Sequence, residues 1–190
     1  MISIAVPIYK GIKNWKFFLD RCLDSIYQQT FTDYEIVATE KGSWAENHNY
    51  AIKQSKGSLI KFLHQDDYFA DKNSLQHIID NFKTGWLISG CDNNPHPYWT
   101  DDIWKGNNKL GGPSCLTIEN ENKSPIYFDE NLSWLVDCDY YMRLYNRYGK
   151  PTILDEINVN IGIHEGQATN LIPAETKIQE YHYMVEKYAH

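Results

Sequence analysis

The chain has 190 residues, enough for one domain whose hydrophobic core needs no disulfide or metal to hold it. Its 18 basic and 25 acidic residues give a net charge of −7, which argues against a protein that binds nucleic acid through the phosphate backbone. Mean hydropathy is −0.56 and no apolar run approaches the roughly 20 residues of a membrane span. The N-terminus lacks a signal-peptide pattern and the four cysteines form no Cys-x-x-Cys pair, so we expect reduced thiols in a cytoplasmic protein.

Strands and helices are predicted to alternate over the first 65 residues. Runs of apolar, often β-branched residues predict three strands, at 2–8, 34–39 and 58–63. Apolar residues at helical spacing predict a helix over 15–27. Ser43, followed three residues later by Glu46, forms a capping-box pattern that begins a second helix, and Gly57 ends it. This order is typical of a parallel sheet covered by helices.

The rest of the chain is predicted to continue as α/β structure. Apolar spacing predicts three helices, at 75–82, 138–148 and 176–188. Four further strands are predicted, at 86–91, 113–118, 125–128 and 152–163. Residues 92–112 combine Asn, Gly and Pro with Trp and Tyr, which indicates a functional loop or irregular insert. With no internal repeat in view, we treat 1–172 as one domain and 173–190 as a C-terminal helical tail.

Polar segments follow the first three predicted strands, at 7–10, 40–43 and 64–67. In parallel sheets ligands bind beyond the carboxyl ends of the strands, so these segments are expected to converge. Asp66 and Asp67 are two adjacent carboxylates at such a strand end, and they suit a hard divalent cation that also binds phosphate oxygens. A helix cap or a turn explains the two residues equally well.

Three more titratable residues have a functional and a structural interpretation. Asp137 and Asp139 open a predicted helix, where the helix dipole favours acidic groups, yet Asp137 could also act as a general base. Arg143 lies one turn after Asp139 and can pair with it, which makes Asp139 the more structural of the two. His164 follows the last predicted strand and is either an ordinary loop residue or a ligand for metal or phosphate.

Other kinds of site have weaker support. The Trp and Tyr side chains of 92–112 could stack on sugar rings or form a small core of their own. The sequence has no Gly-rich phosphate loop of the dinucleotide or P-loop type and no zinc-ligand pattern. No Ser-His-Asp or Cys-His constellation can be assigned from spacing.

Several segments, taken in order, resemble family-2 glycosyltransferases of the GT-A fold. The resemblance covers most of residues 2–165, and its motifs lie at 4–10, 22–30, 34–37, 62–67, 128–132 and 135–144. It implies a single α/β domain with a Rossmann-like, mainly parallel central sheet flanked by helices. It also implies transfer of a sugar from a nucleotide-diphosphate donor to an acceptor hydroxyl, with inversion at the anomeric carbon.

The resemblance assigns roles to individual residues. It implies donor-binding roles for Pro7, Tyr9, Glu40, Asn49, Gln65, Asp66 and Asp67. Asp66 would hold a divalent metal, Mn²⁺ or Mg²⁺, beneath the donor diphosphate, and His164 would complete the metal or diphosphate site. Asp137 matches the catalytic base of inverting members. The acceptor is expected to meet Trp104, Gly112, Ser114, Trp134 and Asp139.

The sequence departs from the family pattern at three places. His64 replaces the first Asp of the D-x-D motif, so that His64-Gln65-Asp66 stands in its place. Glu40 opens the segment that usually reads Asp-Asp-Gly-Ser. His48 occupies the position of a basic residue that usually precedes Asn49.

The expected acceptor is a saccharide or a lipid-linked saccharide, in bacterial surface polysaccharide or glycan synthesis. A lipid-linked acceptor would bring a cytoplasmic protein to the inner membrane face, and the sequence leaves its oligomeric state open. Three alternatives stay in view: a non-catalytic sugar-nucleotide binder, a nucleotidyltransferase and a carbohydrate-binding protein. The altered D-x-D motif suggests the non-catalytic binder, and the aromatic content of 14% suggests the carbohydrate-binding protein.

Overall fold

The computed structural model describes residues 1–167 and 171–189. Within these residues a seven-stranded sheet has the strand order β2-β1-β3-β6-β5-β7-β4. The strands are β1 (Ile2–Pro7), β2 (Tyr34–Thr39), β3 (Leu59–Phe62), β4 (Tyr68–Phe69), β5 (Trp86–Cys91), β6 (Leu116–Glu119) and β7 (Thr152–Asn160). Strands β2, β1, β3, β5 and β7 point the same way, whereas β6 and β4 run antiparallel to their neighbours. The predicted single α/β domain with a mainly parallel sheet is therefore confirmed.

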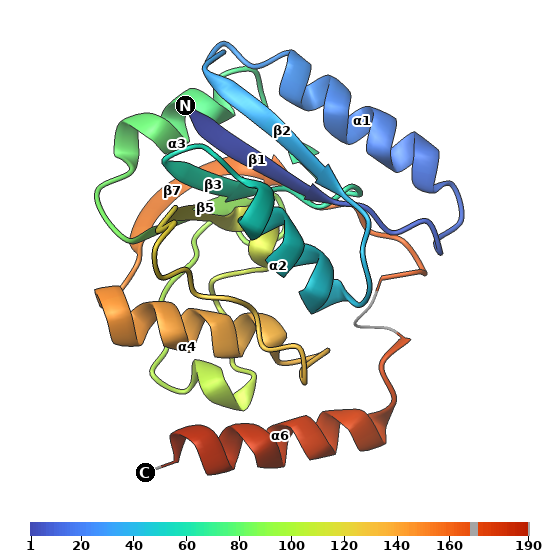
Figure 1. Ribbon diagram of the computed structural model, residues 1–190, viewed down its shortest axis with the longest axis vertical. Helices are drawn as coiled ribbons and strands as arrows, with labels where there is room; N and C mark the ends of the chain where they lie inside the picture. Colours follow the sequence, from blue (N-terminus) through green and yellow to red (C-terminus); the bar gives the residue numbers. More distant parts are fainter. Residues whose placement is uncertain (168–170, 190) are drawn as a thin grey trace.

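Helices cover both faces of this sheet (Figure 1). They are α1 (Trp15–Tyr27), α2 (Trp44–Gln54), α3 (Ser74–Asn81), α4 (Val136–Tyr148) and α6 (Ala174–Tyr188). Figure 1 shows α1 and α3 on one side of the sheet, α2 and α4 on the other, and α6 outside α4. Because both faces are covered, all six residues of β1 are buried, as expected for an apolar strand at the centre of a parallel sheet.

The helix start predicted at Ser43 is confirmed in atomic detail. The Ser43 hydroxyl accepts a hydrogen bond from the backbone N–H of Glu46, and the Glu46 carboxylate accepts one from the backbone N–H of Ser43. Two N–H groups that a helix start leaves without intrahelical partners are thereby satisfied. The cap fixes the beginning of α2 directly after the polar segment that follows β2.

Two strand predictions need correction. The strand expected at 113–118 begins only at Leu116, because Pro113 opens a 3₁₀ turn over Pro113–Cys115. The strand expected at 125–128 is not formed. Instead, the backbone N–H and C=O of Phe128 are both bound by the side chain of Asn49, at 2.7 and 3.0 Å, and this side chain replaces a neighbouring strand.

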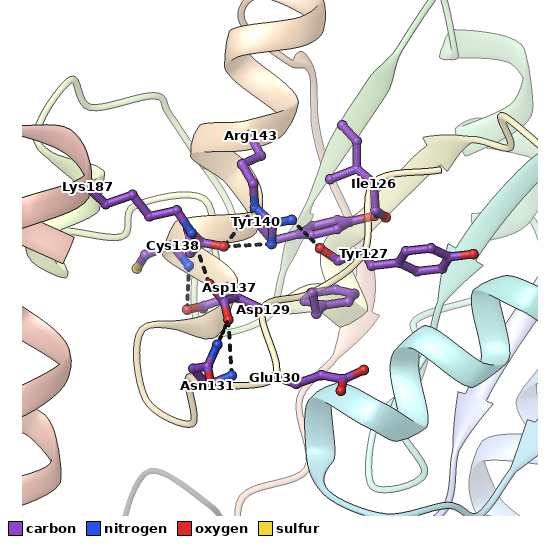
Figure 2. A network of polar contacts seen from close by, with 12 residues as sticks. Ile126, Tyr127, Asp129, Glu130, Asn131, Asp137, Cys138, Tyr140, Arg143 and Lys187 are labelled. Atoms are coloured by element: carbon purple, nitrogen blue, oxygen red, sulfur yellow. Dashed lines mark hydrogen bonds and ion pairs between the residues drawn. The ribbon is translucent and has the colours of Figure 1, made fainter. Parts of the chain in front are cut away.

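The C-terminal helix packs against the domain through a buried carboxylate. Glu180 of α6 is only 5% exposed, and its oxygens accept hydrogen bonds from the backbone N–H groups of Ser133, Trp134 and Leu135, at 2.7, 2.8 and 2.8 Å. These N–H groups immediately precede α4, where a helix has unpaired donors and where its dipole favours a negative charge. Farther along α6, Lys187 reaches Asp129 at 3.0 Å (Figure 2). The segment predicted as a tail thus stabilises the beginning of α4.

Replacing Glu180 with alanine tests this packing. Glu180→Ala would leave buried backbone N–H groups without acceptors, so we expect the free energy of unfolding to fall by about 2–4 kcal/mol. Urea unfolding followed by circular dichroism measures it. Glu186→Ala, at an exposed position of the same helix, should change it by less than about 0.5 kcal/mol. Equal effects of the two substitutions would contradict the capping role of Glu180.

The interior strand β3 carries a lysine with no exposed surface. Lys61 donates a hydrogen bond from Nζ to the carbonyl of Ser114, in the turn that precedes β6. Burial lowers the pKa of Lys61 from its ordinary 10.5 to about 8. The ammonium group is therefore retained at neutral pH at a cost in stability.

The pH dependence of stability tests the buried lysine. Between about pH 8 and pH 10.5 the unfolded chain binds more protons at Lys61 than the folded chain, so the stability contributed by this residue rises with pH. Relative to Lys61→Met, the wild-type chain should gain about 3 kcal/mol across that window. Urea unfolding at pH 7.5 and pH 10 measures the difference. A constant gap between the two proteins would show that Lys61 is not buried as an ammonium.

Candidate functional site

The polar segments that follow β1, β2 and β3 lie together, as predicted. The backbone N–H and C=O of Tyr9 each bond the side-chain amide of Gln65, at 2.8 Å in both cases. Lys10, next to Tyr9, forms an ion pair with Glu40 at the end of β2. Gln65 is buried, whereas the Tyr9 side chain is 64% exposed. The expected convergence at this edge of the sheet is confirmed.

A group of three titratable side chains lies directly after β3. His64, Asp66 and Asp67 each offer one atom to a metal, and these atoms all lie within 4.8 Å of one another. The Asp67 side chain is almost completely buried, and its Oδ1 accepts a hydrogen bond from the N–H of Gly162 at 2.8 Å. Burial, and then the charge of Asp66, raise the pKa of Asp67 from 3.8 to about 7. Two close carboxylates with an imidazole form a donor set that fits a divalent cation.

His164 contacts this group from the segment that follows β7. Its Nε2 lies 3.0 Å from Oδ2 of Asp66, and its ring stacks on Phe18 of α1 with centroids 4.9 Å apart. Arg21 of α1 donates a hydrogen bond to the backbone carbonyl of Asp66. A Cβ on Gly162 would lie 2.0 Å from that same carbonyl oxygen, so the segment carrying His164 needs a glycine to come this close. Metal or diphosphate binding by His164 stays a prediction.

Substitution of Gly162 tests this close approach. Gly162→Ala forces the segment away from Asp66, and we expect a loss of about 1–3 kcal/mol in the free energy of unfolding from overpacking. Gly112→Ala is the matched control, because a Cβ there meets nothing within 4 Å. Chemical denaturation of both variants gives the comparison. A Gly162→Ala protein as stable as Gly112→Ala would show that the segment does not lie against Asp66.

Two histidines from different elements contact each other beside the acidic group. His48 of α2 is buried, with Nδ1 at 2.8 Å from the carbonyl oxygen of Trp44 and Nε2 at 2.9 Å from Nε2 of His64. Burial lowers the pKa values of both imidazoles. Sequence reasoning noted these residues only as departures from a family pattern. Their contact could not be found from the sequence, because it depends on how α2 packs against the end of β3.

Asp137 lies in the first turn of α4 and is held on both carboxylate oxygens. Oδ1 accepts a hydrogen bond from the N–H of Cys138 at 2.8 Å, and Oδ2 accepts one from the side chain of Asn108 at 2.9 Å. Asn108 also donates to the carbonyl of Gly111 at 3.0 Å. Burial raises the pKa of Asp137. Sequence reasoning missed Asn108, since nothing distinguishes it among the other asparagines of 92–112.

One short segment connects Asp137 with the group after β3. It begins at Asn108, which bonds Asp137, and ends at Ser114, whose hydroxyl accepts a hydrogen bond from the backbone N–H of His64 at 2.9 Å. Between them, the carbonyl of Gly111 accepts a hydrogen bond from Tyr141 of α4 at 3.0 Å. The carboxylate predicted as a base and the backbone of His64, at the beginning of the group after β3, therefore border the same segment, 108–114.

The residues predicted on the acceptor side differ in accessibility. Trp104 and Trp134 are half-buried, Gly112 is exposed and Ser114 is buried. Asp139 has no exposed surface, and its carboxylate is held by Arg143, Lys187 and Tyr188. The predicted pairing of Asp139 with Arg143 is therefore confirmed, and the contacts with Lys187 and Tyr188 also join α4 to α6. Buried in this way, Asp139 does not face an acceptor.

Two predicted donor-side residues lie in structural positions. Pro7 ends β1 and is buried. Asn49 is buried in α2, where its side chain binds the backbone of Phe128 and donates to Glu130 at 2.9 Å. Asn49 therefore supports the loop that leads to α4. Donor binding by either residue stays a prediction.

Sequence comparison relates the chain to glycosyltransferases. It is 23% identical, over 95% of its length, to an uncharacterized glycosyltransferase of Rickettsia typhi, and 27% identical, over 48% of its length, to the uncharacterized glycosyltransferase EpsJ of Bacillus subtilis. The chain spans 69% and 33% of these two proteins, respectively. No family model matches it.

Structural comparison gives the same class of fold. A fragment of S. aureus TarS in complex with UDP-GlcNAc superposes with a TM-score of 0.72 at 18% identity, covering 98% of this chain and 66% of the other. The mannosyltransferase PcManGT from Pyrobaculum calidifontis, in complex with GDP-Man and Mn²⁺, superposes with a TM-score of 0.62 at 14% identity. The match covers 88% of this chain and 58% of PcManGT. The chain thus shares the α/β fold of these glycosyltransferases. None of its described helices is long and apolar enough to cross a membrane.

Proposed function

We propose that this chain is an inverting glycosyltransferase of family 2 with the GT-A fold, and that it transfers a sugar from a nucleoside-diphosphate donor to an acceptor hydroxyl. The proposal is carried by one arrangement: Asp137 and the group of His64, Asp66 and Asp67 border the same segment, 108–114. It is supported by the similarity to glycosyltransferases and by the fold shared with the TarS and PcManGT complexes.

The donor binds at the edge formed by the ends of β1, β2 and β3. Tyr9 and Glu40 lie there, Gln65 bonds the backbone of Tyr9, and Asp66 and Asp67 would hold the divalent cation. When bound, the cation stabilises the negative charge that develops on the departing nucleoside diphosphate. The Mn²⁺ in the PcManGT complex and the donor set of this chain both favour such an ion.

Asp137 is the general base. It removes the proton from the acceptor hydroxyl while that oxygen attacks the anomeric carbon and the bond to the diphosphate oxygen breaks. The transition state has oxocarbenium character, and a single displacement inverts the configuration. Burial raises the pKa of Asp137, which makes its carboxylate a stronger base. The hydrogen bonds from Asn108 and Cys138 hold that carboxylate in one orientation.

The acceptor lies against the aromatic side of segment 104–114. Trp104 and Trp134 provide half-buried indole rings that suit stacking on a sugar, and a Cβ on the exposed Gly112 would meet nothing within 4 Å. A Cβ on Gly106 would lie 3.7 Å from the Trp134 ring, so this loop and the start of α4 are in contact. A saccharide or lipid-linked saccharide of bacterial surface polysaccharide synthesis fits such a surface, with the protein working at the cytoplasmic face of the membrane.

The general base gives the sharpest test of this function. Asp137→Asn keeps the shape of the side chain but removes the base, so we expect kcat to fall by about 10²–10⁴-fold. Donor affinity, measured by calorimetry, should change by less than about threefold. Asp24→Asn, an exposed substitution on α1, should alter neither quantity.

Three results would contradict the proposal. Unchanged turnover in Asp137→Asn would exclude this carboxylate as the base. Loss of donor binding equal to the loss of turnover would place Asp137 in the donor site. Donor binding by the wild-type chain with no transfer to any saccharide or lipid-linked saccharide would favour the non-catalytic binder.

A further inference from the structure

The contact between His48 and His64 determines which ring nitrogens carry hydrogen. Nδ1 of His48 lies 2.8 Å from the carbonyl oxygen of Trp44, which can only accept a hydrogen bond, so this nitrogen is the donor. A neutral imidazole has one N–H, and Nε2 of His48 is therefore an acceptor. Nε2 of His64 lies 2.9 Å away and must donate to it. Nδ1 of His64 is then left with a lone pair.

The surroundings of His48 support its neutral form. The side chain is 1% exposed, and the Trp44 ring stacks on it with centroids 3.5 Å apart. The rings of Phe62 and Phe128 lie on other sides of it. Its two nitrogens contact a carbonyl oxygen and another imidazole, neither of which is an anion that would compensate a buried positive charge.

The free nitrogen of His64 faces the acidic group. Nδ1 of His64 lies 3.9 Å from Oδ2 of Asp67, and Asp66 completes the group within 4.8 Å. The lone pair of His64 Nδ1 and the oxygens of the two acidic side chains are thus brought together as potential metal ligands. Such a set of oxygen and nitrogen donors fits a divalent cation bound by all three side chains.

We propose that His48, held by the carbonyl of Trp44, fixes the tautomer of His64 so that Nδ1 of His64 is a ligand of the divalent cation held by Asp66 and Asp67. This inference rests on the cation site of the proposed function and adds a ligand and a positioning residue to it. Metal-binding histidines commonly donate their other N–H to a partner that orients them. Here that partner is an imidazole, itself oriented by a backbone carbonyl.

The nitrogen ligand changes which cation the site prefers. Carboxylate oxygens suit Mg²⁺, whereas an imidazole favours later transition metals such as Co²⁺. His64 occupies the first position of the D-x-D motif. The ratio of Co²⁺ affinity to Mg²⁺ affinity should therefore be higher than in a site that has an aspartate at this position. His64→Asp makes that change within this chain.

The competing source of nitrogen is His164. Its Nε2 lies 3.0 Å from Oδ2 of Asp66, so it could reach a cation on Asp66 from the other side. In the arrangement described here His164 contacts only one carboxylate of the group, whereas His64 belongs to the group of three. The experiment must therefore distinguish the two histidines.

The test is metal binding by the full chain without any nucleotide at pH 7.5. Pulsed electron paramagnetic resonance of bound Mn²⁺ detects coupling to a coordinated ¹⁴N nucleus, and calorimetry gives the affinities for Co²⁺ and Mg²⁺. We expect ¹⁴N coupling in the wild-type chain and in His164→Gln but not in His64→Asp. The preference for Co²⁺ over Mg²⁺ should fall by about tenfold in His64→Asp.

The role of His48 is tested by a pair of variants. His48→Phe keeps a flat ring against Trp44 but removes the acceptor, so we expect Co²⁺ affinity to fall by about 10–100-fold. His48→Gln retains a side-chain acceptor and should bind Co²⁺ within about threefold of wild type. Thermal unfolding checks that each variant is folded.

The metal-binding experiments on these variants have four outcomes that would decide against part of the account. Coupling that persists in His64→Asp and disappears in His164→Gln assigns the nitrogen to His164 and overturns the inference. Wild-type Co²⁺ affinity in His48→Phe overturns the role of His48. If Asp66→Asn abolishes Mn²⁺ binding while His64→Asp is indistinguishable from wild type, the cation site of the proposed function stands and the inference fails. Wild-type Mn²⁺ binding by Asp66→Asn would overturn the cation site itself.

Discussion

β1 pairs in parallel with both β2 and β3, and this pairing sets where the polar groups of the site lie. Three strands that point the same way end at the same edge, so the segments that follow them are brought within hydrogen-bonding distance. Gln65 then binds the backbone of Tyr9, and Lys10 pairs with Glu40. All residues of β1 and three of the four residues of β3 are buried, so the accessible polar groups of this region lie beyond the strand ends.

In the second half of the chain, the proposed base is positioned by the start of a helix and not by the end of a strand. Asp137 lies at the beginning of α4, and this helix start is stabilised by Glu180 of α6 through three backbone N–H groups. Asp139, one residue beyond Cys138, is fixed by Lys187 and Tyr188 of the same helix. Helix α6 is therefore part of the framework that positions Asp137, although it lies far from the ends of β1, β2 and β3 in Figure 1.

The sequence predicts those features that local pattern determines. The capping box at Ser43 and the helical spacing of 138–148 depend on neighbours within a few residues, and the structure has both. The group at Asp66 and Asp67 could be located because parallel strands place their ends together. Asn108, His48 and Glu180 could not be found, since each acts on a residue between 16 and 47 positions away. The strand expected at 125–128 failed for the same reason: a side chain from α2 binds that backbone.

The most direct measurement of the central claim is thermal unfolding with UDP, GDP, TDP and CMP, each with and without Mn²⁺. A ligand at 100 times its dissociation constant stabilises the folded chain by about 2.7 kcal/mol, which is a shift of several degrees for a domain of this size. The account predicts such a shift with one nucleoside diphosphate in the presence of Mn²⁺ and a much smaller one without it. No shift with any of these nucleotides, with or without Mn²⁺, would contradict a donor site at the ends of β1, β2 and β3.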